Sequence, residues 1–165
     1  MAEAMYGVDD PAVHEAVRTY VKLLRAQKSV VARVEPLVAS YGLTLTQFGV
    51  LEALLHKGSL THRELCQKVL TSAGNITDVV DKLEHRGLVC RSRNAADRRN
   101  VYVSLTEQGR ELIKKVFPRH AKDIAQAFAG LSTSEQRELG ALLRKLGRSS
   151  ANAEAPLEKV LSEPK

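Results

Sequence analysis

The sequence has no tryptophan, and aromatic residues make up only 4% of its 165 residues. With 44% hydrophobic residues that are mostly aliphatic, it favours packed helices over a β-sandwich. The two cysteines form no CxxC motif, which excludes a disulfide framework and fits a reducing compartment. No apolar run approaches the ~18 residues that span a bilayer, and the N-terminus lacks the order of a signal peptide. We therefore expect a soluble, cytoplasmic protein.

The motifs of common enzyme classes are also absent. There is no HExxH, no phosphate-binding glycine loop, no GxSxG and no activated cysteine set, so we expect no enzyme, no catalytic residues and no cofactor. His62 and Cys66 stand at i and i+4, the spacing of a two-ligand metal clip, but no further ligands lie nearby and no metal site is predicted. Cys66 is expected to fill a small core site. Cys90, among arginines, leaves a sensor role open.

Positive charge is concentrated in one short segment. The formal net charge is +6, which suits a polyanionic partner, but basicity alone is a weak signal. Between residues 91 and 99 there are four arginines against one acid, Asp97. Such a segment is too short to be the solvated face of a helix.

At this length we expect one domain with its own core. Residues 1–10 are expected to be flexible, and a helix is predicted over 11–40, with a proline at its first turn. Pro36 should bend or end this helix, because proline removes a backbone donor and crowds the preceding turn. The apolar stripe of the helix is Val17, Leu24, Val31 and Val38, one heptad apart.

Three short helices are predicted next. Thr44-Leu45-Thr46-Gln47 and Thr61-His62-Arg63-Glu64 have the pattern of capping boxes. After the second box, apolar residues at i, i+3, i+4 and i+7 predict a further helix that Gly87 ends. The last two helices form a helix-turn-helix at about 61–86. The apolar residues of its second helix are Ile76, Val79, Val80 and Leu83.

The period then changes from helical to alternating. Val101, Val103 and Leu105 alternate with polar neighbours, which predicts a β-hairpin over 88–105 with residues 94–99 as its loop. A helix with a small, polar start beside a basic hairpin is typical of a DNA reader, with the helix in the major groove and the hairpin on the backbone.

Long helices are predicted over 107–148, with a kink at Pro118, a third capping box at Ser132-Thr133-Ser134-Glu135 and an end at Gly147. Residues 149–165 are expected to form a flexible tail. Together with 11–40, these helices carry more apolar surface than the unit at 44–106 needs. We expect them to pack against a second copy, because a single reading helix buries too little interface for specific binding. A monomeric core is the alternative.

Several motifs occur together in one order: Gly-Leu-Thr-Leu-Thr-Gln-Phe at 42–48, Leu-Glu-His-Arg-Gly-Leu-Val at 83–89, Asp-Arg-Arg at 97–99, and Val-Ser-Leu-Thr-Glu-Gln-Gly at 103–109. This order resembles the MarR family of bacterial winged-helix transcription regulators over about residues 11–148. The resemblance implies a mainly α winged helix-turn-helix with a small β-hairpin wing and terminal dimerisation helices. It also implies a homodimer that binds double-stranded DNA at a palindromic operator. Members usually repress genes and are released by a small, often phenolic, ligand or by oxidation.

Candidate DNA-binding residues follow from the chemistry of their side chains. Small residues let the reading helix approach phosphates, Asn75 can pair with adenine, and Asp78 can accept from cytosine. Asp97 can orient the guanidinium of Arg99. The resemblance implies that Arg99 enters an A·T-rich minor groove. We expect Asp81 to face a structural partner. The candidates are Ser72, Gly74, Asn75, Thr77, Asp78, Lys82 and Arg86 on the reading helix, Arg91, Arg93, Asp97, Arg98 and Arg99 on the wing, and Thr61, His62 and Arg63 on the supporting helix.

Other interpretations of these residues stay open. Ser72 and Asn75 could serve as helix caps alone, and the arginines could belong to a solvated loop. The chain would then be a winged-helix module for protein contacts without specific DNA readout. Tyr20 and Gln27 are weak candidates for a small-molecule effector pocket, because they interrupt the aliphatic stripe where the family's pocket lies. They could equally turn their polar ends to solvent.

Overall fold

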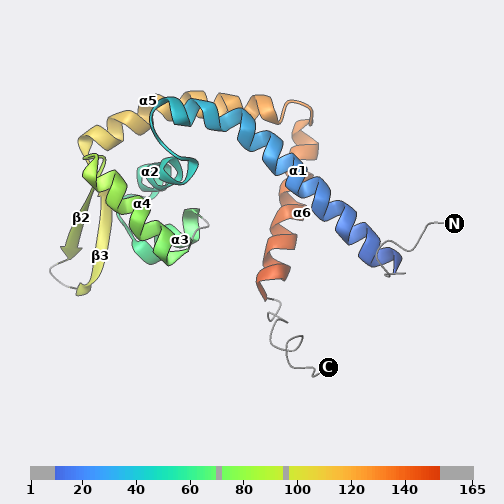
Figure 1. Cartoon of the computed structure of the whole chain (residues 1–165), viewed down its shortest axis with the longest axis horizontal. Coiled ribbons are helices and arrows are strands. Elements are labelled where there is room, and N and C mark those ends of the chain that lie inside the picture. Colours follow the sequence, from blue (N-terminus) through green and yellow to red (C-terminus); the bar gives the residue numbers. More distant parts are fainter. Residues whose placement is uncertain (1–9, 70–71, 95–96, 153–165) are drawn as a thin grey trace, which may run out of the picture. The chain divides into compact units, whose positions relative to one another are not determined.

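The computed structural model describes residues 10–69, 72–94 and 97–152, and leaves out the side chains of residues 73, 93–94, 97–99 and 151–152 (Figure 1). The chain folds as two compact units, Met1–Ala127 and Phe128–Lys165. The elements in chain order are α1 (Pro11–Ser40), α2 (Leu45–Lys57), β1 (Leu60–Thr61), α3 (His62–Val69), α4 (Ala73–His85), β2 (Val89–Asn94), β3 (Asp97–Leu105), α5 (Glu107–Ala127) and α6 (Thr133–Asn152).

The first helix begins where the sequence predicts and runs further than its internal proline suggests. Asp10 caps it by accepting a hydrogen bond from the Ala12 amide at 2.8 Å. Pro36 lies inside α1 and does not end it, since the helix continues to Ser40. Apart from Asp10, the segment expected to be flexible at the N-terminus lies outside the described residues, and so does most of the predicted tail.

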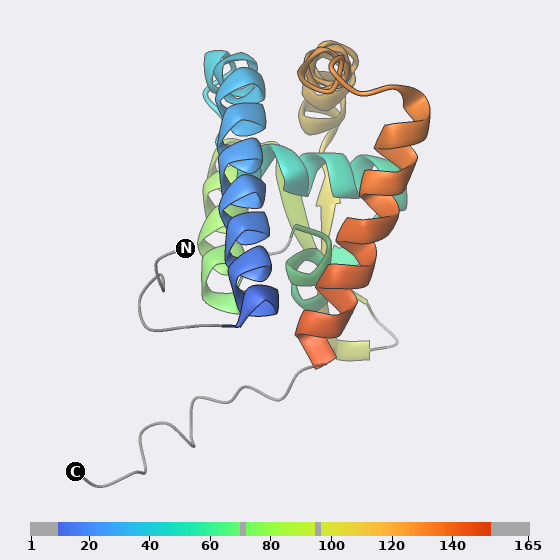
Figure 2. The same ribbon diagram turned by 90° about the vertical axis from the view of Figure 1, so that its right-hand side faces the viewer.

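The helix-turn-helix is built from local caps that the sequence predicts. In α2, the Gln47 amide donates to Thr44 Oγ1 at 3.2 Å and the Thr44 amide to Gln47 Oε1 at 2.9 Å. In α3, the carboxylate of Glu64 accepts from the Thr61 amide at 2.8 Å, which lowers the pKa of Glu64. Both capping boxes are therefore confirmed. The axis of α2 is turned 78° from that of α1 (Figure 2).

The sheet has three strands where two were predicted. Its order is β1-β3-β2 with antiparallel neighbours, and the two-residue β1 pairs Leu60 with Val103 and Thr61 with Tyr102. So short a strand leaves no alternation in the sequence from which to predict it. Strands also run into the predicted loop at 94–99: β2 extends to Asn94 and β3 starts at Asp97, with an irregularity between Arg93 and Asn94.

One core joins the helix-turn-helix to the adjoining ends of the long helices. The C-terminal part of α1 and the first half of α5 contribute Leu37, Val38, Ile113 and Val116 to the buried cluster. The predicted DNA-binding unit at 44–106 therefore shares its core with the adjoining ends of α1 and α5. His120 of α5 lies in this core with only 7% of its surface exposed.

A close backbone contact joins the wing to α5. A Cβ built on Gly109 would lie 1.9 Å from the Leu88 carbonyl oxygen, so only glycine fits at this position. Thr106 secures the same junction, because its hydroxyl donates to the Gly87 carbonyl at 2.6 Å. Gly109, the last residue of the Val-Ser-Leu-Thr-Glu-Gln-Gly motif, thus allows α5 to start directly against the turn that precedes β2.

In the second unit, α6 begins at the third predicted capping box. The Ser132 amide donates to Glu135 Oε2 at 2.7 Å and the Glu135 amide to Ser132 Oγ at 3.3 Å. The helix passes Gly147, its predicted end, and continues to Asn152. In the described ranges no single helix is long and apolar enough to cross a membrane, and only α1 and α2 taken together across their bend meet that test.

Candidate DNA-binding surface

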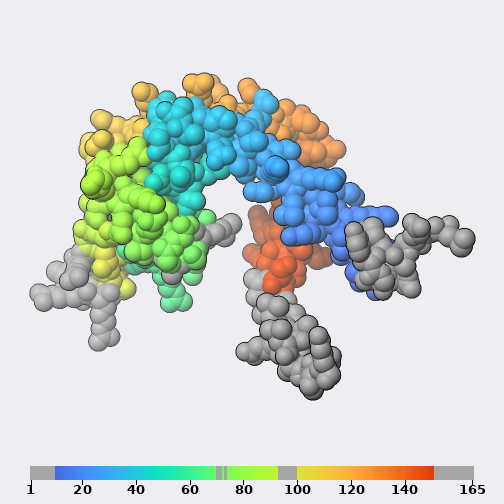
Figure 3. All heavy atoms as spheres, viewed as in Figure 1, coloured from blue at the N-terminus to red at the C-terminus, as the bar shows by residue number. Residues whose placement is uncertain are grey.

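Helix α4 presents small and polar residues outward. Ser72 caps it, since the Asn75 amide donates to Ser72 Oγ at 3.3 Å. A Cβ on Gly74 would meet nothing within 4 Å, so the start of the helix is open to a close approach. The helix lies open on the face shown in Figure 3. Its inward side is Ile76, Val79, Val80 and Leu83, and its exposed predicted contacts are Ser72, Gly74, Asn75, Thr77, Asp78, Lys82 and Arg86.

Two of these exposed residues pair with each other. Lys82 Nζ lies 2.7 Å from Asp78 Oδ2, one helical turn away, and both side chains are about 60% exposed (61% and 59%). A solvent-exposed pair of this kind contributes little to stability, roughly 0.3–0.5 kcal/mol. The ammonium and the carboxylate can therefore separate at little cost when another ion or a base edge approaches.

Arg91 of β2 is bound to two carboxylates of α4, those of Asp81 and Glu84. Its guanidinium donates to Asp81 and, at 2.5 Å, to Glu84 Oε2, while its backbone amide donates to Glu84 Oε1 at 3.0 Å. We call these three residues the Arg91 clamp. Asp81 was expected to face a structural partner, and that partner is Arg91. The clamp fixes the base of the wing to the helix beside it.

His62 adjoins the Arg91 clamp from the start of α3. Burial and the charge of Arg91 lower the pKa of His62. Within the described residues its Nε2 is buried and makes no hydrogen bond. A neutral imidazole at this place lets α3 pack beside the clamp without adding a second cation.

Arg86, the C-cap of α4, reaches back to the end of α1. Its guanidinium donates to the Gly42 carbonyl at 2.6 Å and to the Tyr41 carbonyl at 3.2 Å. Sequence reasoning expected this arginine to bind DNA phosphates, and the structure gives its guanidinium these two protein partners. No signal in the sequence links residues 86 and 42, since they are 44 positions apart.

A shallow groove runs between the start of α3 and the strand β3 of the wing. Arg63 on one side and Asn100 and Tyr102 on the other are among its lining residues, together with Thr61 and His62. Asn100 and Tyr102 were not among the predicted contacts. The alternation of β3 could have found them, because both lie in register opposite to the fully buried Val103: Asn100 is exposed and Tyr102 is half-buried. The side chains of Arg93, Asp97, Arg98 and Arg99 lie outside the described residues.

Comparisons with known proteins identify this arrangement. The family model of the transcriptional regulators SarA/Rot matches residues 33–116. YkoM, an uncharacterized HTH-type transcriptional regulator of Bacillus subtilis, is 38% identical over 84% of this chain and 90% of its own length. BpsR of Bordetella bronchiseptica superposes with a TM-score of 0.71 and 32% identity, over 79% of this chain and 98% of that one. A MarR family protein from Bacillus stearothermophilus is 31% identical, with a TM-score of 0.63, over 84% and 98%.

The chain belongs to the MarR family. Regulators of this family bind double-stranded DNA, act as dimers and are not enzymes. The expected winged helix-turn-helix and the expected class of DNA-binding transcription regulator are thereby confirmed.

In this MarR-family chain, the N-terminal half of α1 carries an exposed apolar stripe. Large hydrophobic residues that are 37–59% exposed follow one another there: Val13, Val17, Tyr20, Val21 and Leu24. In the second unit, α6 carries a comparable exposed group, Leu142, Leu143 and Leu146. Exposed apolar stripes of this length mark interaction surfaces.

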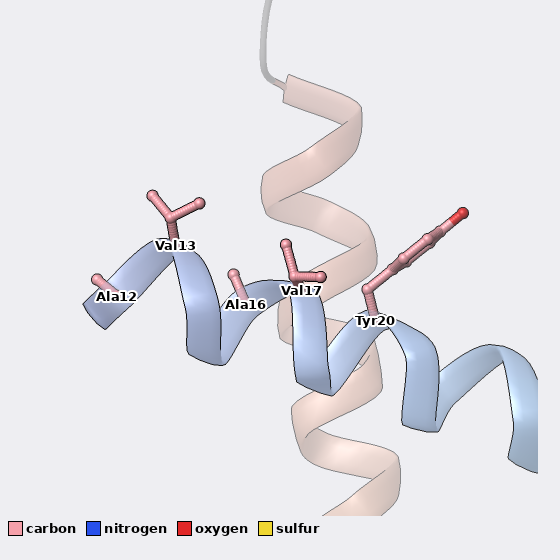
Figure 4. A pocket seen from close by; sticks show the side chains of 5 residues that line it. All are labelled: Ala12, Val13, Ala16, Val17 and Tyr20. Carbon is pink, nitrogen blue, oxygen red and sulfur yellow. The ribbon is translucent and has the colours of Figure 1, made fainter. Parts of the chain in front are cut away.

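The two effector candidates of this MarR-family chain lie exposed on α1. Tyr20 borders a hollow whose other lining residues, among them Val13 and Val17, come from the same helix face (Figure 4). Gln27 is also exposed and is not part of that hollow. A hollow on one helix encloses no ligand, so a binding pocket at Tyr20 requires a second surface.

Neither cysteine of this MarR-family chain is in a metal-binding group within the described residues. Cys66 is partly buried and packs against the core, as predicted, whereas Cys90 is exposed on β2 opposite Ser104.

Proposed function

We propose that the protein is a homodimeric repressor that reads a palindromic operator and is released from it by a small-molecule effector. The observation that carries the proposal is the open, small-residue start of α4, held beside the wing by the Arg91 clamp. A rigid pair of helix and wing can enter adjacent grooves of one duplex without losing conformational entropy at that junction.

The major groove is read by α4. Gly74 lets the helix start approach the phosphates closely, where backbone amides can donate to them. Asn75 can pair with adenine and Asp78 can accept a hydrogen bond from cytosine N4. The hydroxyl of Thr77 can hydrogen-bond to either base. Lys82 then leaves Asp78 for a phosphate, since their exposed pair is weak.

The minor groove is read by the wing. Arg99, oriented by Asp97, enters an A·T-rich stretch where the potential is most negative, and Arg93 and Arg98 bind phosphates. Arg63 binds the backbone from the start of α3, across the groove lined by Asn100. Thr61 and Ser72 contribute as caps of their helices, because their side chains already serve backbone amides.

Three predicted DNA contacts take another role in this proposal. Arg91 is 24% exposed in its side chain and is paired with two carboxylates, so a phosphate would have to displace both. Arg86 is engaged by two carbonyls. We assign both arginines to holding the reading surface together. His62 also takes a structural role: burial lowers its pKa from 6.5, so that its imidazole is neutral at physiological pH and packs against the clamp.

The dimer is formed by the apolar surfaces of α1 and α6. When the stripes of two protomers pack together, their hydrophobic surface is removed from water. This burial stabilises the dimer by about 25 cal/mol for each Å² of apolar surface buried. The partner also supplies the second wall that the hollow at Tyr20 lacks, which leaves Tyr20 and Gln27 as candidate effector residues. BpsR supports an effector of this kind, because its own DNA binding is regulated by 6-hydroxynicotinic acid.

The test begins with fragments selected from the source genome by the purified protein. Operator affinity should fall by about 10³–10⁵ between 50 and 200 mM salt if the dimer makes ~6–10 phosphate contacts. Arg99→Ala should weaken operator binding by about 1–3 kcal/mol and relax preference at the A·T-rich flank. Affinity that does not depend on salt, or no preference for any fragment, would favour a module for protein contacts. 6-Hydroxynicotinic acid is the first effector to titrate into the complex.

A further inference from the structure

The guanidinium of Arg86 joins two elements that have little other direct contact. Helix α4 packs mainly on α2, α3 and β2, whereas α1 packs on α5 and α2. Arg86 Nη1 lies 2.6 Å from the Gly42 carbonyl oxygen and Nη2 lies 3.2 Å from that of Tyr41. Both acceptors follow directly after Ser40, the last residue of α1. The C-cap of the reading helix is thus hydrogen-bonded to the end of the helix that carries the apolar stripe.

The end of α1 is a favourable place for a cation. A helix leaves its last carbonyls without intrahelical partners and carries a partial negative charge there. The last turn of α1 has no basic residue of its own. Gly42 has a φ of 67°, which ends the helix, and a Cβ added there would lie 3.6 Å from Arg86 Nη2. Arg86 therefore supplies, from the C-terminus of α4, the positive charge that the last turn of α1 lacks.

We infer that Arg86 is a positioning residue that fixes the reading helix α4 to the end of α1 and thereby sets the separation of the two reading helices in the dimer. This inference rests on the proposed dimeric DNA reader. The two half-sites of an operator are spaced by the helical repeat of DNA, so each α4 must sit at a fixed place relative to the dimer interface. The fork of an arginine can hold two carbonyls at once and so resists both sliding and rotation.

The experiment compares the operator with copies whose half-sites are one base pair closer or further apart. Arg86→Ala should reduce the preference for the native spacing by about three- to tenfold. A change of this size in the ratio of affinities is what the loss of an exposed, charge-assisted hydrogen bond gives. The salt dependence of binding should not change, because Arg86 neutralises no phosphate. Arg86→Lys should restore part of the preference, since an ammonium can serve one of the two carbonyls.

Lys82→Ala is the matched control, one turn earlier on the same helix. It should reduce the slope of log affinity against log salt by about 1 and leave the spacing preference intact. If Arg86→Ala reduces the salt slope in this way, or leaves the spacing preference unchanged in a variant with the wild-type circular dichroism spectrum, the inference is wrong. A wild-type protein that does not distinguish the operator from random DNA would instead overturn the proposed function.

Discussion

Removing the guanidinium of Arg91 should loosen the wing from the reading helix. Arg91→Ala deletes the two ionic hydrogen bonds to Asp81 and Glu84 and leaves the bond from the residue's backbone amide to Glu84 in place. The protein should therefore stay folded, with the wing strand still paired to β3, while the free energy of unfolding falls.

The size of this fall follows from the exposure of the partners. The Asp81 carboxylate is 58% exposed, so its bond is close to a surface pair at about 0.2–1 kcal/mol. The Glu84 carboxylate is 38% exposed and holds the 24% exposed guanidinium at 2.5 Å, which places its bond nearer the 1.5–3 kcal/mol range for charged groups, reduced by solvent screening to about 1–2 kcal/mol. With both bonds lost, Arg91→Ala should lower the free energy of unfolding by about 2 kcal/mol.

Urea unfolding at one fixed protein concentration measures this loss, because the stability of a dimer depends on concentration. Double-mutant cycles that combine Arg91→Ala with Asp81→Asn or Glu84→Gln should give a larger coupling energy between Arg91 and Glu84 than between Arg91 and Asp81. A loss below about 0.5 kcal/mol for Arg91→Ala, or the reverse order, would mean that the clamp does not hold the wing.

Three further results are expected. Burial in the core lowers the pKa of His120 from 6.5, so the unfolded chain binds a proton at this residue more readily than the folded protein, and stability should fall as the pH drops below about 6.5. In thermal melts, His120→Leu should reduce the dependence of the melting temperature on pH in this range. An unchanged dependence would mean that another group causes the fall. Gly109→Ala should lower stability by about 1–3 kcal/mol because its Cβ meets a carbonyl, whereas Gly140→Ala, with open space around it, should be neutral or stabilising. Leu142→Glu should give monomers in sedimentation and abolish operator binding, and a dimer of wild-type strength would place the interface on other residues.

Much of the fold follows from contacts within one helical turn or one strand. The capping boxes at Thr44 and Thr61 could be predicted because donor and acceptor are three residues apart. The inward face of α4 could be predicted because its apolar residues repeat with the period of a helix. The exposed start of α4 follows from the same periodicity. The assignment of Asp81 to a structural partner was correct, although the partner itself was unknown.

The roles of the arginines could not be predicted in the same way. The sequence shows Arg86 and Arg91 as two basic residues close to a helix-turn-helix, which is the pattern of phosphate contacts. Their acceptors are 44 and 45 residues away for Arg86, and for Arg91 they lie across a turn on a different element. Nothing local distinguishes a guanidinium that meets a carbonyl in the fold from one that meets a phosphate outside it.

The amino-acid sequence by itself determined which segments become helices and the wing hairpin, where the helices begin, and which faces are apolar, because these depend on neighbours along the chain. Only the tertiary structure decided which charges are already paired within the molecule. It also brought β1 to the sheet and His120 into the core. The reason is that pairing and burial depend on distances between segments far apart in sequence, and those distances exist only once the core has formed.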